Sequence, residues 1–169
     1  MQDISETLLL ARSARSLVFL AIAILVVVLA TIVGSSVTTP VISTWYAGLN
    51  KPWFNPPNIV FPIVWPFLFA LMAFGFWRIL RVVNGGTPRN RAIFAFFIQL
   101  LFNMGWSLAF FGAQSTLAGL VAAVGLVISV ARMVVTFSKV DRLAAWVQLP
   151  YLAWVTFAMF LTATIWWIN

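Results

Sequence analysis

The chain has 169 residues, of which 63% are hydrophobic and only 8% are charged, and its formal net charge is +7. A soluble domain carries about 25% charged residues, so this composition excludes a water-facing globular fold. With no cysteine, no histidine and only three acidic residues, disulfides, thiolate and serine–histidine catalysis, most metal sites and paired-carboxylate catalysis are also excluded.

Apolar runs long enough to cross the bilayer, at about 20 residues each, follow one another along the chain. Strands of a membrane barrel alternate in hydrophobicity, so continuous apolar runs instead predict an all-α integral membrane protein. A polar or interfacial lead-in is expected at residues 1–14, and a single five-helix transmembrane domain at 15–169. The predicted helices span about 15–37, 59–83, 89–111, 115–138 and 141–167.

One connection in this bundle differs from the others. The first helix is expected to end near Gly34-Ser35-Ser36, and the turn sequence NGGTP at 84–88 stops the second. Only the connection between these helices, at 38–58, is long. It contains "WYAGLNKPWFNPPN" (45–58), with three prolines and four aromatic rings. Because proline restricts the backbone, we expect a structured loop that acts either as a semi-rigid lid or as an interfacial anchor.

The basic residues predict an orientation. Nine of the ten lie before the first helix or around the second and fourth turns between helices, and only Lys51 lies on the opposite side. The positive-inside rule then places the N-terminus in the cytoplasm, with the 38–58 loop and the C-terminus outside. In a bacterium this is the inner membrane. Because the charges flank apolar runs, topology explains them and no nucleic-acid partner is expected.

Polar groups within the spans are costly in hydrocarbon and usually face the bundle interior. Gln99, Asn103 and Ser107 share one face of the third helix, with Trp106 and Phe110 on the same side. This face is either a cavity wall or a set of interhelical hydrogen bonds, and the sequence leaves both interpretations open.

The second and fifth helices carry aromatic stripes at helical spacing, which indicate either packing or a binding wall. Trp65 and Phe69 belong to the first stripe, and Tyr151, Trp154 and Ala158 to the second. A pocket of aromatic rings with few polar groups suits a large, flat, apolar ligand. The spans offer no buried carboxylate, which argues against a proton-coupled antiporter.

Three blocks resemble one family in order and in sequence. They are "WYAGLNKPWFNPPNIVFPIVW" (45–65), "QLLFNMGWSLAFF" (99–111) and "LPYLAWVTFA" (149–158). Together they are similar to the TspO/MBR family of tryptophan-rich sensory proteins and translocator proteins. The resemblance implies five transmembrane helices, usually as a homodimer, with one ligand cavity per protomer under the 38–58 loop. Members bind porphyrins such as protoporphyrin IX and haem.

The resemblance also implies a set of ligand-binding positions, carried over residue by residue. They are Tyr46, Pro52, Trp65, Phe69, Asn103, Trp106, Phe110, Tyr151, Trp154 and Ala158. Trp65 and Trp154 match the tryptophans implicated in light- and oxygen-dependent porphyrin breakdown, so they are the candidates for any catalysis. No metal site is expected. Since the chain has no histidine, a porphyrin or haem ligand is expected to be held by aromatic and apolar contact, and no cofactor is obligatory.

One feature of the eukaryotic branch is incomplete here. The family's cholesterol-recognition pattern needs a Lys or Arg after the tyrosine of the last helix, and none follows Tyr151. Such patterns are weak even when complete, so specific cholesterol binding is not expected.

The resulting prediction is a tetrapyrrole-binding membrane sensor or carrier. The first alternative is a porphyrin-degrading photochemical activity that uses Trp65 and Trp154, either in its own right or as a side activity. The second alternative is a small-molecule transporter or a membrane assembly partner.

Overall fold

The computed structural model describes residues 2–82 and 85–169, with side chains from Ser13 onward. Five long helices dominate this part of the chain: α1 (Gln2–Ile42), α3 (Val60–Arg81), α4 (Gly86–Ser107), α5 (Thr116–Ser138) and α7 (Leu149–Ile168). The shorter elements are α2 (Trp45–Gly48), a π-helix, η1 (Leu108–Gly112), that continues α4, and α6 (Arg142–Trp146).

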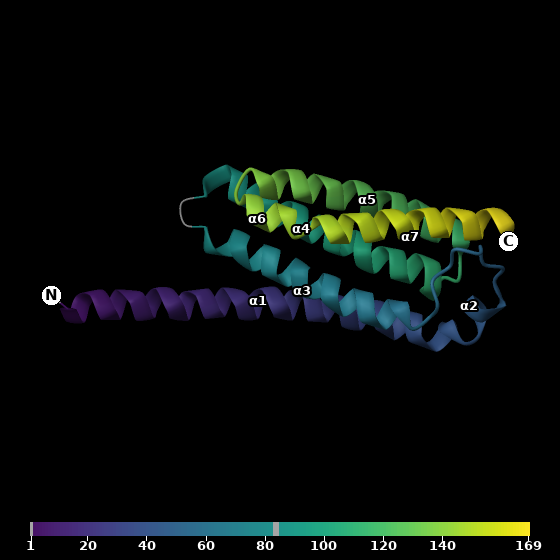
Figure 1. The fold of residues 1–169 in the computed structure, drawn as a ribbon, viewed down its shortest axis with the longest axis horizontal. Helices are drawn as coiled ribbons and strands as arrows, with labels where there is room; N and C mark the ends of the chain where they lie inside the picture. Colours follow the sequence, from purple (N-terminus) through teal and green to yellow (C-terminus); the bar gives the residue numbers. More distant parts are fainter. Residues whose placement is uncertain (1, 83–84) are drawn as a thin grey trace.

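The described residues contain five segments that are long and apolar enough to cross a membrane. They are Ser13–Ile42, Val60–Arg81, Gly86–Gly112, Thr116–Ser138 and Arg142–Ile168. Neighbouring segments run in opposite directions, so the two chain ends lie at opposite ends of the bundle (Figure 1). The prediction of an all-α membrane protein with five spans is confirmed.

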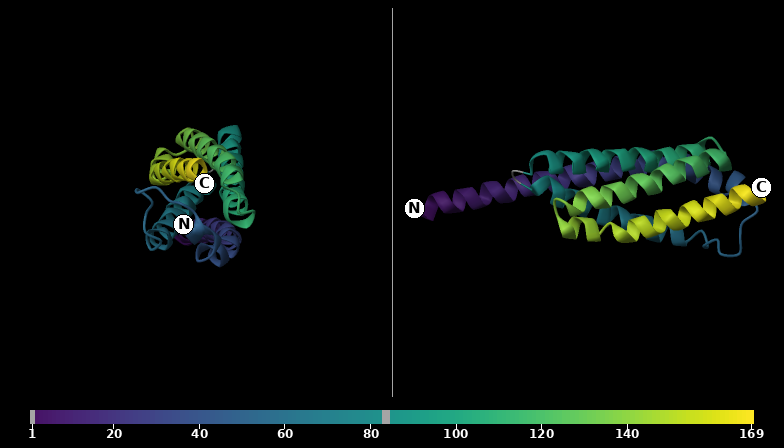
Figure 2. Two further views of the ribbon diagram at one scale, coloured as in Figure 1. Left: turned by 90° about the vertical axis from the view of Figure 1, so that its right-hand side faces the viewer. Right: turned by 90° about the horizontal axis from the view of Figure 1, so that it is seen from above.

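The helices form a closed ring. Helix α1 packs against α3 and α4, α5 packs against α4 and α7, and α3 contacts α7. Around the bundle the order is therefore α1, α3, α7, α5, α4, and the view along the axis shows this arrangement (Figure 2). The interior is bordered mainly by α1, α3, α4 and α7.

The larger apolar core fills one end of the interior, and a smaller cluster formed by Tyr46, Phe110, Phe111, Leu161 and Ile165 lies at the other end. Near the turn between α3 and α4, Phe76 stacks on Phe96 with ring centroids 3.7 Å apart, and Met72, Ile79 and Met133 are fully buried around them. Such aromatic and aliphatic packing stabilises the helix contacts through buried apolar area. Below, this half is called the inner half, and the half that carries α2 and the long loop is called the outer half.

Helix α1 is longer than the sequence indicated. It begins at Gln2 rather than near 15, and it continues through Pro40 to Ile42 rather than ending near 37. At 41 residues it measures about 60 Å, twice the hydrocarbon thickness of about 30 Å. Its first turns run past the ends of the other helices (Figure 1). The interfacial role predicted for residues 1–14 stays a prediction.

The Gly34-Ser35-Ser36 segment was expected to end α1, but the helix continues through it. Ser35 donates to the Ile32 carbonyl (3.2 Å) and Thr38 to the Gly34 carbonyl (2.8 Å), both within the same helix. A hydroxyl that donates to a carbonyl of the preceding turn has its hydrogen bond without interrupting the helix. The serine residues at 35 and 36 therefore did not end α1.

The predicted fifth helix, 141–167, is in fact two helices. Helix α6 ends at Trp146, and α7 begins at Leu149. Pro150 explains the break, because it has no N–H for the Trp146 carbonyl and its ring crowds that carbonyl. The predicted end of the second helix at 83 and the stop signal at Asn84 lie outside the described residues, among which α3 ends at Arg81.

Two polar contacts hold the inner end together. Arg78 of α3 forms a salt bridge of 2.7 Å with Asp141, whose carboxylate also caps α6 by accepting from the Ala144 amide. Arg89 of α4 donates to the carbonyls of Ile79 and Leu80 in the last turn of α3, and the Ile79 carbonyl also accepts from the Val82 amide. Both contacts fix the inner ends of neighbouring helices.

Candidate functional site: a cavity in the outer half of the bundle

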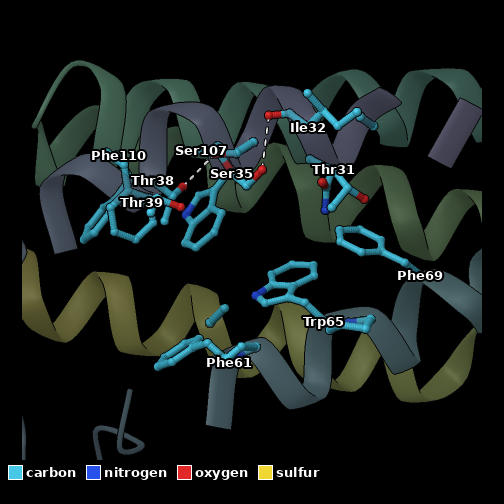
Figure 3. A pocket seen from close by; sticks show the side chains of 18 of the residues that line it. Thr31, Ile32, Ser35, Thr38, Thr39, Phe61, Trp65, Phe69, Ser107 and Phe110 are labelled. Atoms are coloured by element: carbon cyan, nitrogen blue, oxygen red, sulfur yellow. Dashed lines mark hydrogen bonds between the residues drawn. The ribbon is translucent and has the colours of Figure 1, made fainter. Parts of the chain in front are cut away.

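The outer half of the bundle is hollow. A cavity of about 790 Å³ lies between α1, α3, α4, η1 and α7, below the long loop (Figure 3). Among the described residues no charged side chain lines it. A volume of about 300–1,000 Å³ is typical of small-molecule sites.

Stacked aromatic rings form one wall of this cavity. Trp65 stacks on Phe69 in α3, with ring centroids 5.2 Å apart, and lies 6.4 Å from Trp106 in α4. Trp106 in turn stacks on Phe110 of η1 at 5.9 Å. The π-helix adds one residue to its turn, and Phe110 and the adjacent Phe111 are both buried there. The wall therefore presents extended flat surfaces to the interior.

The opposite wall carries hydroxyl groups. Thr31, Ser35, Thr38 and Thr39 of α1 face the cavity across from Trp65 and Phe69 (Figure 3). Their spacing of i, i+4, i+7 and i+8 puts them on one helix face. These four residues were not predicted as site residues, although their periodicity within an otherwise apolar span was a readable signal.

Tyr46 of α2 closes the outer end. Its side chain is buried, packs against Phe110 and Phe111, and donates its hydroxyl to Asn55 Oδ1 at 3.0 Å. Burial raises the pKa of the Tyr46 phenol by more than the hydrogen bond with Asn55 lowers it. The phenol is therefore protonated at neutral pH and remains a hydrogen-bond donor.

The loop above Tyr46 is fastened at two points. Lys51 Nζ lies 4.8 Å from the centre of the Tyr46 ring and donates to the carbonyls of Ala47 and Leu49. At the end of α7, the Asn169 side chain accepts from the Asn50 amide (2.9 Å) and donates to the Asn50 carbonyl (3.0 Å). The Asn50–Asn169 pair thus ties the middle of the loop to the last span.

A buried polar network lies beside the cavity. The Tyr151 hydroxyl accepts from Asn103 Nδ2 and donates to Gln99 Oε1, both at 3.0 Å, and Gln99 Nε2 contacts Met72 Sδ at 3.6 Å. Gln99 and Tyr151 are fully buried and link α4 to α7. For Gln99, the interhelical interpretation of the polar face is therefore correct. Asn103 belongs to the network and also lines the cavity.

Comparison with known proteins decides the family. The model of the TspO/MBR family matches residues 21–168. The chain belongs to this family. A tryptophan-rich protein TspO from Chlorobaculum tepidum is 40% identical over 136 residues, covering 80% of this chain and 86% of that protein. A protein of the same name from Archaeoglobus fulgidus is 39% identical, with 80% and 87% covered. The human translocator protein is 33% identical, with 72% and 73% covered.

Most of the residues carried over from the TspO/MBR resemblance come together in this cavity. Those that line it are Tyr46, Trp65, Phe69, Asn103, Trp106, Phe110 and Ala158. The aromatic stripe of α3 divides between two roles, because Trp65 and Phe69 face the cavity whereas Met72 and Phe76 are buried in the inner core.

Three of the carried-over positions do not line the cavity. Tyr151 is fully buried in the main apolar core, and its hydroxyl is bonded to two amides. Trp154 packs instead against Phe61, with ring centroids 6.0 Å apart, and its indole Nε1 is buried with no acceptor among the described residues. Pro52 lies in the loop, where its carbonyl accepts from the Asn55 amide at 3.0 Å.

The cavity is not sealed on every side. Several residues that line it are also exposed, and these lie mainly on α1 and α3. They are Ile24, Val28, Ile32, Ser35 and Thr39 on α1, Pro62, Pro66 and Ala70 on α3, and Asn58 in the loop. Both helices span the membrane, so this opening faces the hydrocarbon of the bilayer rather than water.

Proposed function

We propose that this protein binds a tetrapyrrole, such as protoporphyrin IX or haem, in the outer-half cavity and acts as a membrane sensor or carrier. The observation that carries the proposal is the uncharged cavity of about 790 Å³ with its stacked wall of Trp65, Phe69, Trp106 and Phe110. A macrocycle is flat and largely apolar, so aromatic faces can hold it by stacking without a metal ligand from the protein.

Two routes are available for ligand exchange. The loop over Tyr46 covers the aqueous end of the cavity and must move to release a ligand there, and the opening between α1 and α3 faces hydrocarbon and offers a second route to an apolar ligand. The names of two relatives, tryptophan-rich sensory protein and translocator protein, agree with a role in sensing or translocation. Nothing in the geometry favours a catalytic role for the Trp65 and Trp154 pair, because Trp154 does not line the cavity.

We further propose the bacterial inner membrane as the location, with α1 beginning in the cytoplasm and the loop outside, and a homodimer as the assembly. The excess of basic residues at the inner end supports this orientation. Labelling of single cysteines introduced at exposed Trp53 and at exposed Lys139 tests it in intact cells. A thiol reagent that cannot cross the membrane should modify the cysteine at position 53 only. Modification of the cysteine at position 139 alone would show that the protein has the opposite orientation.

A direct binding measurement tests the main proposal. Protoporphyrin IX is titrated into nanodiscs with and without the protein, and the shift of its Soret absorbance gives the Kd. Trp65→Phe should weaken binding about 3- to 10-fold, because a smaller ring loses stacking worth about 0.5–1.5 kcal/mol. Trp154→Phe is the matched control and should change the Kd by less than about twofold.

Two results would count against tetrapyrrole binding in this cavity. The first is a titration in which the Soret absorbance shows no saturable difference between nanodiscs with the protein and nanodiscs without it. The second is an equal loss of affinity in the two tryptophan variants, which would separate binding from the cavity wall that Trp65 forms.

A further inference from the structure

The lining of the cavity is unevenly polar along its length. Its inner end is apolar, formed by residues such as Val27, Ala30 and Ala73. Hydroxyl groups gather at its outer end, where Ser35, Thr38 and Thr39 project from α1 (Figure 3). These three residues are called the hydroxyl stripe below.

The hydroxyl stripe retains hydrogen-bonding capacity. The Ser35 and Thr38 hydroxyls donate to carbonyls of their own helix, which leaves the lone pairs of each oxygen able to accept. For the Thr39 hydroxyl no partner occurs among the described residues. The stripe therefore offers several acceptors and one uncommitted hydroxyl to whatever occupies the cavity.

One further polar group on the cavity wall lacks a partner. Asn103 is only 6% exposed and its Nδ2 donates to Tyr151, but its Oδ1 has no partner within the described part of the chain. Polar groups of buried side chains are nearly always paired, so this acceptor indicates an occupant that carries a hydrogen-bond donor.

Within the described part of the chain, no cationic side chain lines the cavity to bind an anionic occupant. The basic group in the loop, Lys51, is engaged with the Tyr46 ring and with the carbonyls of Ala47 and Leu49. Polar groups of the ligand must therefore be recognised by neutral hydroxyl and amide groups, and at the outer end they also lie nearest to the headgroup layer.

We propose that the hydroxyl stripe binds the carboxyl-bearing edge of a flat ligand, whose protonated carboxyl groups donate to the Ser35 and Thr38 oxygens and accept from the Thr39 hydroxyl. The ligand is thereby oriented with its apolar edge toward Val27 and Ala73. This inference rests on the proposed function, since it assigns an orientation to the ligand of the same cavity. It predicts selectivity for porphyrins with carboxyl side chains over those with only alkyl side chains. The competing explanation is that the hydroxyls serve only their own helix.

The chain provides matched controls for this proposal. Ser36 in α1 donates to the Val33 carbonyl and Thr164 in α7 donates to the Phe160 carbonyl, as the stripe residues do within α1. Neither Ser36 nor Thr164 lines the cavity. The Ser36→Ala, Thr164→Val double variant thus removes similar helix bonds without changing the cavity.

The test compares two probes in nanodiscs: protoporphyrin IX, with two propionate groups, and etioporphyrin, with alkyl groups only. The Ser35→Ala, Thr38→Val, Thr39→Val variant should lose about tenfold in affinity for protoporphyrin IX, as expected for hydrogen bonds to a charged or acidic group. Its affinity for etioporphyrin should change by less than about twofold, and the control variant should match the wild type for both probes.

Three outcomes would overturn the assignment. Equal losses for the two porphyrins would show that the stripe only shapes the cavity. An unchanged affinity for protoporphyrin IX would show that the hydroxyls serve their own helix alone. If the wild-type protein binds neither probe, the proposed function fails and the orientation fails with it, whereas the first two outcomes leave tetrapyrrole binding intact.

Discussion

Tyr151 shows how a single hydroxyl can stabilise the boundary between the inner core and the outer cavity. It bridges Gln99 and Asn103, so two amides from α4 are paired with one side chain of α7. Interhelical hydrogen bonds of this kind contribute about 0.6–2 kcal/mol each. The position carried over as a ligand contact therefore has a structural role that the sequence pattern alone did not reveal.

Tyr151→Phe separates these two roles. The variant keeps the ring but leaves Gln99 Oε1 and Asn103 Nδ2 without partners, which should destabilise the protein by about 1–3 kcal/mol. Thermal unfolding in detergent measures this loss, and the Kd for protoporphyrin IX should change by less than about threefold. A large loss of affinity with unchanged stability would instead place Tyr151 in contact with the ligand.

The salt bridge between Arg78 and Asp141 makes stability depend on pH. Partial burial favours the neutral carboxyl, but the hydrogen bond from Arg78, the Ala144 amide and the charge of Arg78 outweigh it and lower the pKa of Asp141. Its contribution is fully present above the unfolded pKa of about 4 and is lost as pH falls through the lower pKa of the folded protein.

Asp141→Asn tests this contribution and retains a residue that can cap α6. At neutral pH the variant should be less stable by about 0.2–1 kcal/mol, since the pair is partly exposed. The difference should shrink to zero below about pH 3, as measured by unfolding at a series of pH values. A difference that does not vary with pH would contradict an ionic contribution.

At the scale of elements, helix periodicity predicted which residues share a face but not which way each face points. Gln99, Asn103 and Trp106 were correctly placed together on one side of α4, yet Gln99 points to Tyr151 while Trp106 lines the cavity. Helix rotation and crossing decide this, and both depend on side-chain packing between helices distant in sequence. The same limit explains why the hydroxyl stripe of α1 was not assigned to the site.

The Asn50–Asn169 pair should control how long the loop stays over the cavity. Asn169→Ala removes both hydrogen bonds to Asn50, each worth about 0.5–1.5 kcal/mol, so ligand dissociation should accelerate several-fold. Stopped-flow displacement of bound protoporphyrin IX measures the rate. Trp53→Ala in the same loop is the control, since Trp53 is 95% exposed.

An equal dissociation rate in wild type and Asn169→Ala would show that the loop does not limit exchange. Exchange would then occur through the opening between α1 and α3, and the loop would serve as an interfacial anchor.

Two glycines test the close contacts between helices. A Cβ at Gly119 of α5 would lie 2.5 Å from Cδ2 of Phe110, so Gly119→Ala should displace a ring of the cavity wall and lower both stability and affinity. A Cβ at Gly105 of α4 has no atom within 4 Å in the protomer, so Gly105→Ala should be tolerated. Thermal unfolding and porphyrin titration compare the two, and equal effects would contradict the contact assigned to Gly119.

At the scale of the whole molecule, the protein is a bundle with a packed inner half and a hollow outer half. Composition and apolar run length were sufficient to predict five spans, because crossing a bilayer demands about 20 apolar residues each time. The break before Pro150 and the full length of α1 were missed. Both depend on local backbone hydrogen bonding, which hydropathy does not report.

The hollow outer half carries the central claim, that a flat tetrapyrrole lies between the aromatic wall and the hydroxyl stripe. A structure of the protein with protoporphyrin IX, solved in lipid, is the most direct test. The account predicts a macrocycle in contact with Trp65, Phe69 and Trp106, with its propionates toward Ser35, Thr38 and Thr39. A porphyrin bound on the outer surface of the bundle, with the cavity filled by lipid, would contradict it.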